Sequence, residues 1–119
     1  MAMTYKRLAG PLTATTSTTS IYTVPQNTTT VVKEFMLTNY SASAATITVY
    51  VKEANVTLGD AHIIISDLSL SADETFSMSA SLVLHNDGGV ASATTSDQIH
   101  VVASVGSAIN IVMNGIEDA

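Results

Sequence analysis

The three histidines are the side chains in this sequence best suited to acid–base chemistry or metal binding. They stand at His62, His85 and His100, and no two of them have the i, i+4 spacing or the close pairing of known zinc motifs. We therefore expect structural or surface histidines rather than metal ligands. Asp87 and Asp97 suggest calcium ligands, but no Asp-x-Asp-x-Asp pattern surrounds them. Solvated carboxylates in a turn are expected instead.

Other catalytic patterns are missing from the sequence. There is no cysteine, which removes thiolate metal sites, cysteine nucleophiles and disulfides together. There is no Gly-x-Ser-x-Gly motif, phosphate-binding loop or dinucleotide fingerprint. Paired carboxylates for glycoside hydrolysis would need an aromatic cleft, and the chain has four Tyr, two Phe and no Trp. The sequence predicts a protein that is not an enzyme and has no cofactor.

The charge content is low. Charged residues make up 12% of the 119 residues, about half of the roughly 25% found in an average soluble domain. The net charge is −6, and the four cations, Lys6, Arg7, Lys33 and Lys52, are scattered. Phosphate backbones are bound by clustered cations, so we expect no nucleic-acid partner. A surface rich in Ser, Thr and Asn favours lateral packing against other subunits, although a monomer that uses Thr in its strands also fits.

The length predicts one domain with a core of its own. No run of about 18 apolar residues is present for a membrane span, and residues 1–12 lack the apolar run of a signal peptide. We therefore expect synthesis in the cytoplasm and no membrane partner.

Short runs rich in Thr, Val and Ile alternate with polar turns through most of the sequence, which is typical of an all-β protein. The expected strands are residues 21–24, 29–40, 45–51, 62–70, 75–79, 81–84, 98–104 and 108–116. They predict an antiparallel β-sandwich or jelly roll of about eight strands, with a closed barrel as the alternative. The expected core is Val24, Val31, Phe35, Leu37, Ile47, Val49, Val51, Ile63, Ile65, Leu68, Phe76, Met78, Leu82, Leu84, Ile99, Val101, Ile109, Ile111 and Met113.

Local patterns refine three of these segments. Residues 29–40 have apolar side chains in both alternation sets, which indicates a central strand or one whose second face is covered by a neighbour. With residues 45–51 they are expected to form an antiparallel hairpin. Residues 71–74 match a capping box, but the period-two residues that follow favour a turn. Residues 86–96 are expected to be a flexible loop.

Seven residues are candidates for contact with a partner. Residues 1–19 are expected to form an N-terminal arm before a sandwich domain at 20–119, and the arm is either a docking segment or a disordered tail. Three tyrosines in or beside the early strands would form a binding surface if they face outward, or else cap the core. The turn that begins the long loop is a further candidate. The candidates are Lys6, Arg7, Tyr22, Tyr40, Tyr50, Asn86 and Asp87.

The order of four segments resembles a known group of proteins. Residues 19–25, 29–39 and 44–51 are similar to the Leu-Tyr-Thr-Val-Pro, Val-Lys-x-Ile-x-Leu-x-Asn and Ala-Thr-Val-Thr-Val strands of small tailed-bacteriophage virion proteins. Residues 110–117 resemble the last strand of that group, which closes with Gly-x-Glu. The sequence departs from the pattern after Leu84, where the group has a compact turn and this chain has a longer segment.

The resemblance implies a non-enzymatic structural protein of a bacteriophage virion, most directly a capsid decoration or cement protein that binds and stabilises the assembled shell. Such a protein would be a homo-oligomer, for example a trimer, because many weak contacts on a symmetric lattice add up. The implied partners are the major capsid protein or tail and neck proteins. The alternatives are a tail, neck or fibre-associated component and a host-surface glycan-binding module that uses exposed tyrosines and the long loop.

Overall fold

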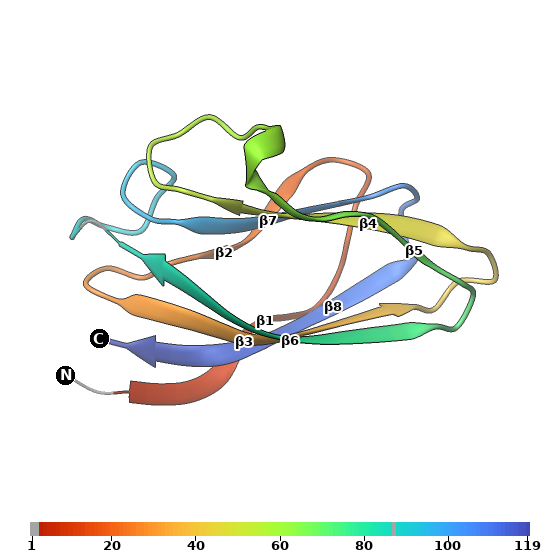
Figure 1. Ribbon diagram of the computed structural model, residues 1–119, viewed down its shortest axis with the longest axis horizontal. Coiled ribbons are helices and arrows are strands. Elements are labelled where there is room, and N and C mark those ends of the chain that lie inside the picture. The colour runs from red at the N-terminus through yellow and green to blue at the C-terminus, as the bar shows by residue number, and fades with distance from the viewer. Residues whose placement is uncertain (1–2, 87) are drawn as a thin grey trace.

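The computed structural model describes residues 3–86 and 88–119, which form two layers of antiparallel strands (Figure 1). One layer has the strand order β1-β8-β3-β6 and the other β2-β7-β4-β5. The strands are β1 (Met3–Thr13), β2 (Thr19–Thr23), β3 (Thr29–Asn39), β4 (Ala45–Lys52), β5 (Ile63–Leu70), β6 (Thr75–His85), β7 (Gln98–Ala103) and β8 (Ile109–Asp118), with a short 3₁₀ turn, η1 (Asp60–His62), before β5.

Two four-stranded antiparallel sheets in this order form a jelly roll. The predicted sandwich is therefore confirmed, and the closed-barrel alternative is wrong because each sheet ends in two edge strands. The strand count is right for a different reason from the one expected. Residues 75–79 and 81–84 belong to a single strand, β6, and the eighth strand is β1. Within the described part of the chain, no helix has both the length and the apolar character to cross a membrane.

The N-terminal segment is a strand of the sandwich, so the boundary expected at residue 20 is wrong. β1 pairs with β8 from Met3 opposite Asp118 to Thr13 opposite Asn110. The alternation pattern did not indicate this strand for two reasons. As an edge strand β1 fully buries only Ala9, and two register shifts along it interrupt the period of two.

The hairpin expected from β3 and β4 is also wrong, because the two strands lie in different layers. Asn39, fully buried at the end of β3, organises the crossing between them. Its side-chain amide donates to the carbonyl oxygens of Ser43 and Leu70 over 2.9 and 3.0 Å. Its side-chain oxygen accepts from the backbone N–H and the hydroxyl of Ser41. Since Leu70 ends β5, this one side chain connects the two sheets.

The core lies between the two layers, and most of its expected members are fully buried. Those expected on the edge strands β5 and β6 are instead half-buried, apart from Leu84, and so are Val31 and Val51. Three large side chains are buried that were not expected in the core, Tyr22, Val32 and Leu70. The confirmed members are Val24, Phe35, Leu37, Ile47, Val49, Leu84, Ile99, Val101, Ile109, Ile111 and Met113.

A bulge in β3 explains its two apolar sets. The register against β8 shifts between Val32 and Glu34, so Lys33 and Glu34 both lie on the outer side of the sheet. The shift places Val32 on the same face as Phe35, and Val32 is fully buried while Val31 is not. The bulge therefore changes which alternate residues of β3 face the core. This change, and not a neighbour that covers the second face of the strand, explains why both alternation sets contain apolar residues.

Gly115 lies where this bulge meets β8. A Cβ atom on Gly115 would lie 2.2 Å from the carbonyl oxygen of Val31 and 2.7 Å from Cδ1 of Leu8. The strand on the other side of β8 also shifts its register here, between Arg7 and Ala9. Irregularities in β1 and β3 thus flank one glycine, and bulges of this kind bend a sheet.

Candidate functional site

Two of the candidate contact residues, Lys6 and Tyr22, meet at Glu117. Lys6 Nζ lies 3.1 Å from Glu117 Oε1. The Tyr22 hydroxyl donates to Glu117 Oε2 over 2.5 Å and lies 2.7 Å from Thr30 Oγ1. Burial, together with the hydrogen bond to Glu117, raises the pKa of the Tyr22 hydroxyl far above its usual value. Because Tyr22 belongs to one sheet and Thr30 and Glu117 to the other, the group ties the layers together.

We expect Tyr22→Phe to lower the free energy of unfolding by about 1 to 3 kcal/mol, because it leaves the Thr30 hydroxyl and the Glu117 carboxylate without a buried partner. Urea denaturation followed by far-UV circular dichroism measures the loss. Tyr40→Phe is the matched control, since Tyr40 is 48% exposed, and it should change stability by less than about 0.5 kcal/mol. Equal losses in the two variants would contradict the assigned role.

The raised pKa of Tyr22 also predicts a dependence on alkaline pH. The unfolded chain ionises near the ordinary tyrosine pKa of 10.0, while the folded chain keeps the proton. The folded state therefore loses stability as pH rises above about 10. Unfolding free energies between pH 9 and 11 should fall more steeply for the wild type than for Tyr22→Phe, and parallel curves would contradict this expectation.

The three candidate tyrosines do not form a common exposed cluster, because Tyr22 is buried. Tyr40 follows the end of β3 and is exposed, and Tyr50 in β4 is partly buried. Arg7 lies exposed on β1. Asp87 lies outside the described residues. A shared tyrosine surface is therefore wrong, while Tyr40 and Arg7 remain accessible for contact.

The long loop after β6 is fixed at its base. Asn86 donates to the carbonyl oxygen of Val24 over 3.2 Å and to Ser96 Oγ over 2.9 Å. The Asp97 carboxylate accepts the backbone N–H groups of Ala54 and His85, both over 2.9 Å. Asp97 is therefore a structural acceptor and not the solvated carboxylate expected. Asn86 likewise holds the loop, which leaves the outer part of the loop for contact with other molecules.

The histidines have separate local roles. His62 Nδ1 accepts the backbone N–H of Gly59 over 3.0 Å, and His100 Nε2 lies 3.1 Å from Gln98 Oε1. Burial lowers the pKa of His100, and the nearby Lys52 and His62 lower it further. Among residues 3–86 and 88–119, no group of three or more His, Asp or Glu side chains is arranged to hold a metal ion.

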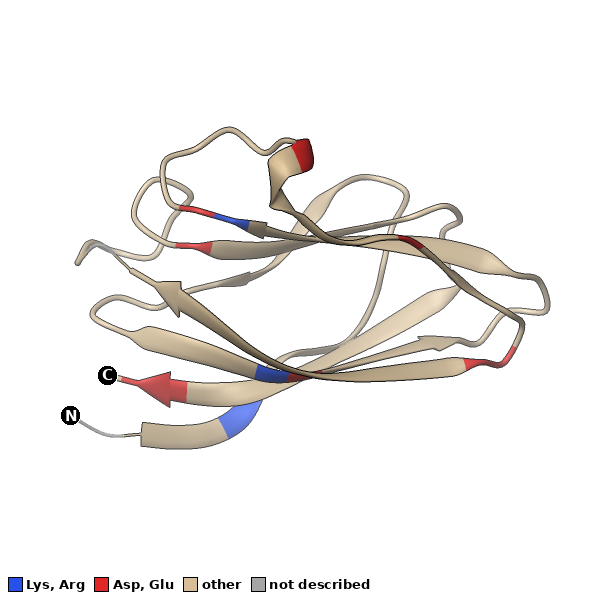
Figure 2. Cartoon of the chain, in the orientation of Figure 1, with Lys and Arg blue, Asp and Glu red and all other residues tan. Residues whose placement is uncertain are grey.

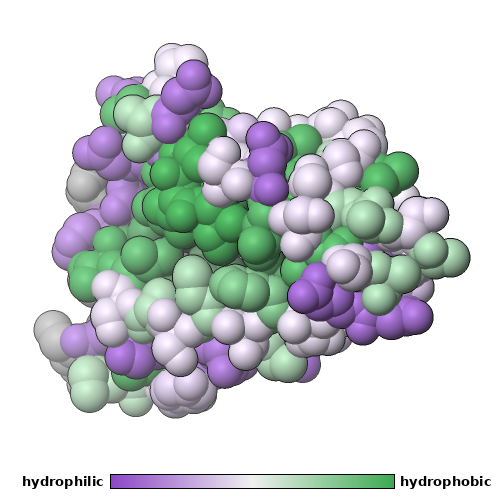
Figure 3. Space-filling view, turned by 45° about the vertical axis from the view of Figure 1, so that its right-hand side comes forward, coloured by the Kyte–Doolittle hydropathy of each residue, from purple (hydrophilic) through white to green (hydrophobic). Residues whose placement is uncertain are grey.

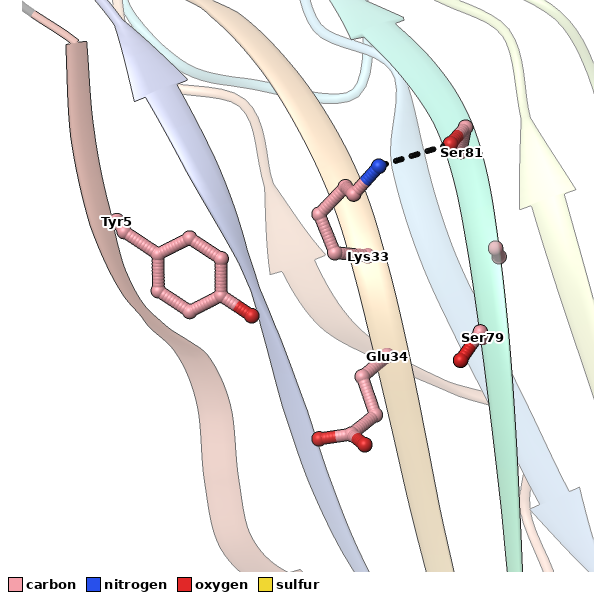
Figure 4. Close-up of a pocket in the computed structure, with 6 residues that line it drawn as sticks. Tyr5, Lys33, Glu34, Ser79 and Ser81 are labelled. Carbon is pink, nitrogen blue, oxygen red and sulfur yellow. Dashed lines mark hydrogen bonds between the residues drawn. The ribbon is translucent and has the colours of Figure 1, made fainter.

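An open hollow of about 680 Å³ lies on the outer face of the β1-β8-β3-β6 sheet (Figure 4). The Tyr5 ring extends from β1 towards β8, on the side where Lys33 and Glu34 of β3 lie. Lys33 Nζ donates to Ser81 Oγ over 3.0 Å, and Asn114 donates to Glu34 Oε1 over 3.3 Å. The hollow thus combines an aromatic ring, one cation, one carboxylate and hydroxyl groups, which suits contact with a polar surface. The lining residues are Tyr5, Lys33, Glu34, Ser79, Ala80 and Ser81.

Comparison with solved structures finds the same fold in a virus. The chain is similar to part of a chain in the structure of infectious bursal disease virus, Gx strain, with a TM-score of 0.55 and 12% sequence identity. The match covers 98% of this chain and 31% of that chain, so this chain spans about a third of its length. A chain of the Gt strain structure aligns over 98% of this chain and 28% of its own, with a TM-score of 0.42 and 12% identity.

No protein-family model and no curated protein matches the sequence. At 12% identity the likeness to the Gx strain chain concerns the fold. Tyr5 is not among the contact residues expected from the sequence, because residues 1–19 are expected there to form an arm. Its place in the hollow depends on the pairing of β1 with β8, and no local pattern indicates that pairing.

Proposed function

We propose that this protein is a non-enzymatic structural protein of a virus particle, and specifically a capsid decoration or cement protein of a tailed bacteriophage. The strand order β1-β8-β3-β6 and β2-β7-β4-β5 carries the proposal, because viral capsid domains commonly use the jelly roll. The likeness in fold to a chain of the infectious bursal disease virus structure supports a place in a virion. The resemblance of the strand sequences to tailed-phage proteins supports the narrower assignment.

The surface chemistry suits packing against other proteins. Figure 2 shows the few charged residues distributed over several strands and loops of both layers. Weak repulsion between neighbours allows many copies to sit close together on a shell. Each copy then needs only modest affinity, because a contact that bridges two shell subunits gains from their high local concentration. The proposed partner is the major capsid protein, and self-association as a homo-oligomer would increase this effect.

Strand β1 is the proposed docking element. It is an edge strand, and its Tyr5 and Arg7 are exposed, whereas Lys6 is engaged by Glu117. An exposed arginine beside an aromatic ring is a common anchor in protein interfaces. The docking role expected of a free arm is therefore proposed for a strand that is already ordered.

The test is to mix purified protein with shells that lack it and to pellet the shells. We expect saturable co-sedimentation, and Arg7→Ala should weaken the apparent affinity about five- to tenfold. Glu53→Ala is the control, since it removes an exposed charge that directly follows β4 in the other sheet, and it should bind within about twofold of the wild type.

Absence of co-sedimentation at saturating protein would contradict the decoration role. Binding to isolated tails or necks, and not to shells, would move the protein to those structures. Equal weakening by both substitutions would remove β1 as the docking element while leaving the shell as the partner.

A further inference from the structure

The four edge strands differ in their protection against pairing with another chain. An edge strand presents unpaired backbone N–H and C=O groups, and proteins commonly protect such edges with charges, prolines, bulges or short length. β1 carries Lys6, Arg7 and Pro11, and β2 has five residues. β5 has a register shift beside Asp67, whose φ is 44° and whose backbone N–H donates to Thr48 Oγ1. Three of the four edges are therefore protected.

Strand β6 lacks two of these protections, charge and proline, over most of its length. It is 11 residues long and contains neither a charged residue nor a proline from Thr75 to Leu84. Its side chains alternate between half-buried and exposed from Phe76 to Val83, although its register against β3 shifts between Ser79 and Leu82. A long edge without charge or proline pairs readily with a further strand.

The sandwich is also open beside this edge. Most inward-facing side chains of β5 and β6 stay half-buried, apart from Leu70 and Leu84, whereas most of those of β3 and β4 next to them are fully buried. Figure 3 shows a broad apolar area between the two layers. Part of the core itself therefore meets solvent on the side where β5 and β6 lie, and a contiguous apolar area of this kind marks an interaction surface. The half-buried side chains include Ile65, Leu68, Phe76, Met78 and Leu82.

We propose that two copies of the chain associate through β6, antiparallel to each other about a two-fold axis near Ala80. Ala80 is the midpoint of β6, so this register gives the longest overlap. It places Phe76 and Met78 opposite Leu84 and Leu82 of the second copy. The two four-stranded sheets become one continuous sheet, and each copy covers the open side of the other.

The charge distribution favours a second copy in this orientation. Asp73 and Glu74 directly precede β6, and His85 ends it. Antiparallel pairing keeps the Asp73–Glu74 turns of the two copies at opposite ends of the strand pair, whereas parallel pairing would bring these four carboxylates together. Like charges that lie opposite each other oppose association. An isologous two-fold contact is also the commonest form of soluble oligomer.

The side of the molecule with β5 and β6 is large enough to hold an interface of standard size. The molecule measures 44 × 29 × 19 Å, and Figure 1 looks down the shortest axis onto this side. The outline of the side, 44 by 29 Å, is larger than the roughly 800 Å² that each partner contributes to such an interface.

Sedimentation equilibrium of the purified protein, without shells, tests the proposal. We expect a mass of about twice 12.4 kDa. Ser77→Lys places a charge on the exposed face of β6 and should raise the dissociation constant at least tenfold. Ser66→Lys is the matched control, because it adds the same charge at an exposed position of the edge strand β5, and it should leave the dissociation constant within about threefold.

Cross-linking tests the register in a chain that has no cysteine of its own. Residues directly opposite in an antiparallel pair have Cα atoms about 4.5 to 5.5 Å apart, within the range that a disulfide spans. Ala80→Cys should therefore give a disulfide-linked dimer on mild oxidation, and Ser66→Cys should not.

A monomer at 0.5 mM, roughly the upper range of weak association, would overturn the proposal. A stable trimer, or a dimer that both lysine substitutions weaken equally, would also overturn it. If a variant fails to fold, hydrogen exchange of the wild type tests the association through β6. The β6 amides of the wild type should become more protected as the protein concentration rises. These measurements need no shell, so this inference and the proposed function can fail independently.

Discussion

Gly115→Ala is expected to destabilise the fold by about 3 to 5 kcal/mol. The added Cβ would lie 2.2 Å from the carbonyl oxygen of Val31 and 2.7 Å from Leu8 Cδ1. The Leu8 side chain is able to rotate away, but the Val31 oxygen belongs to the backbone of β3. Strands β3 and β8 must therefore separate at their centre and weaken their hydrogen bonds. Urea denaturation measures the loss, which is a large part of the roughly 5 to 15 kcal/mol of a typical domain.

Gly106→Ala is the control for this substitution. Gly106 lies between β7 and β8, and a Cβ atom there would meet nothing within 4 Å. Its stability should stay within about 0.5 kcal/mol of the wild type, or rise slightly, because alanine restricts the unfolded chain. Comparable stability of the two variants would show that β8 does not approach β3 as closely as described.

Asn39→Asp is expected to cost about 3 to 5 kcal/mol at pH 7, although it changes the shape of the side chain very little. The substitution replaces an amide that donates to two carbonyl oxygens, those of Ser43 and Leu70, with a charged oxygen that repels both. The position is fully buried, so water cannot compensate. Protonation of the introduced carboxyl returns one donor, and the loss should therefore be smaller at pH 4 than at pH 7.

The matched control is Asn110→Asp, which adds the same charge. The Asn110 side-chain oxygen accepts from the Thr13 hydroxyl over 2.7 Å at an exposed position, and a carboxylate keeps that role. We expect a change of less than about 0.5 kcal/mol. Equal losses of stability at the two positions would mean that the added charge destabilises the protein and that the buried hydrogen bonds of Asn39 do not contribute.

The layered architecture could be predicted from the sequence because a strand with one buried face repeats with period two. β8 shows this clearly, with Ile109, Ile111 and Met113 all fully buried as expected. The prediction failed where the period is interrupted. One extra residue at Lys33 moved Val32 into the core in place of Val31. The irregular edge strand β1 was taken for an arm for the same reason.

The contact residues were harder to predict because their roles depend on partners far away in the sequence. Lys6 and Tyr22 have the character of surface anchors when they are considered alone. Both are held by Glu117, and Asn86 is held by Val24 and Ser96. The Tyr5 hollow, conversely, exists only because β1 and β3 flank β8. No local sequence pattern indicates which strands lie next to each other in a sheet.

The pairing of β1 with β8 has a practical consequence for engineering. Met3 lies opposite Asp118, and Figure 1 shows the start of β1 next to the end of β8. Two peptides or reporter domains fused genetically to the two ends would therefore emerge side by side from the same corner. A split enzyme attached in this way would reassemble on each folded molecule, and its signal would report whether the first and last strands had found each other.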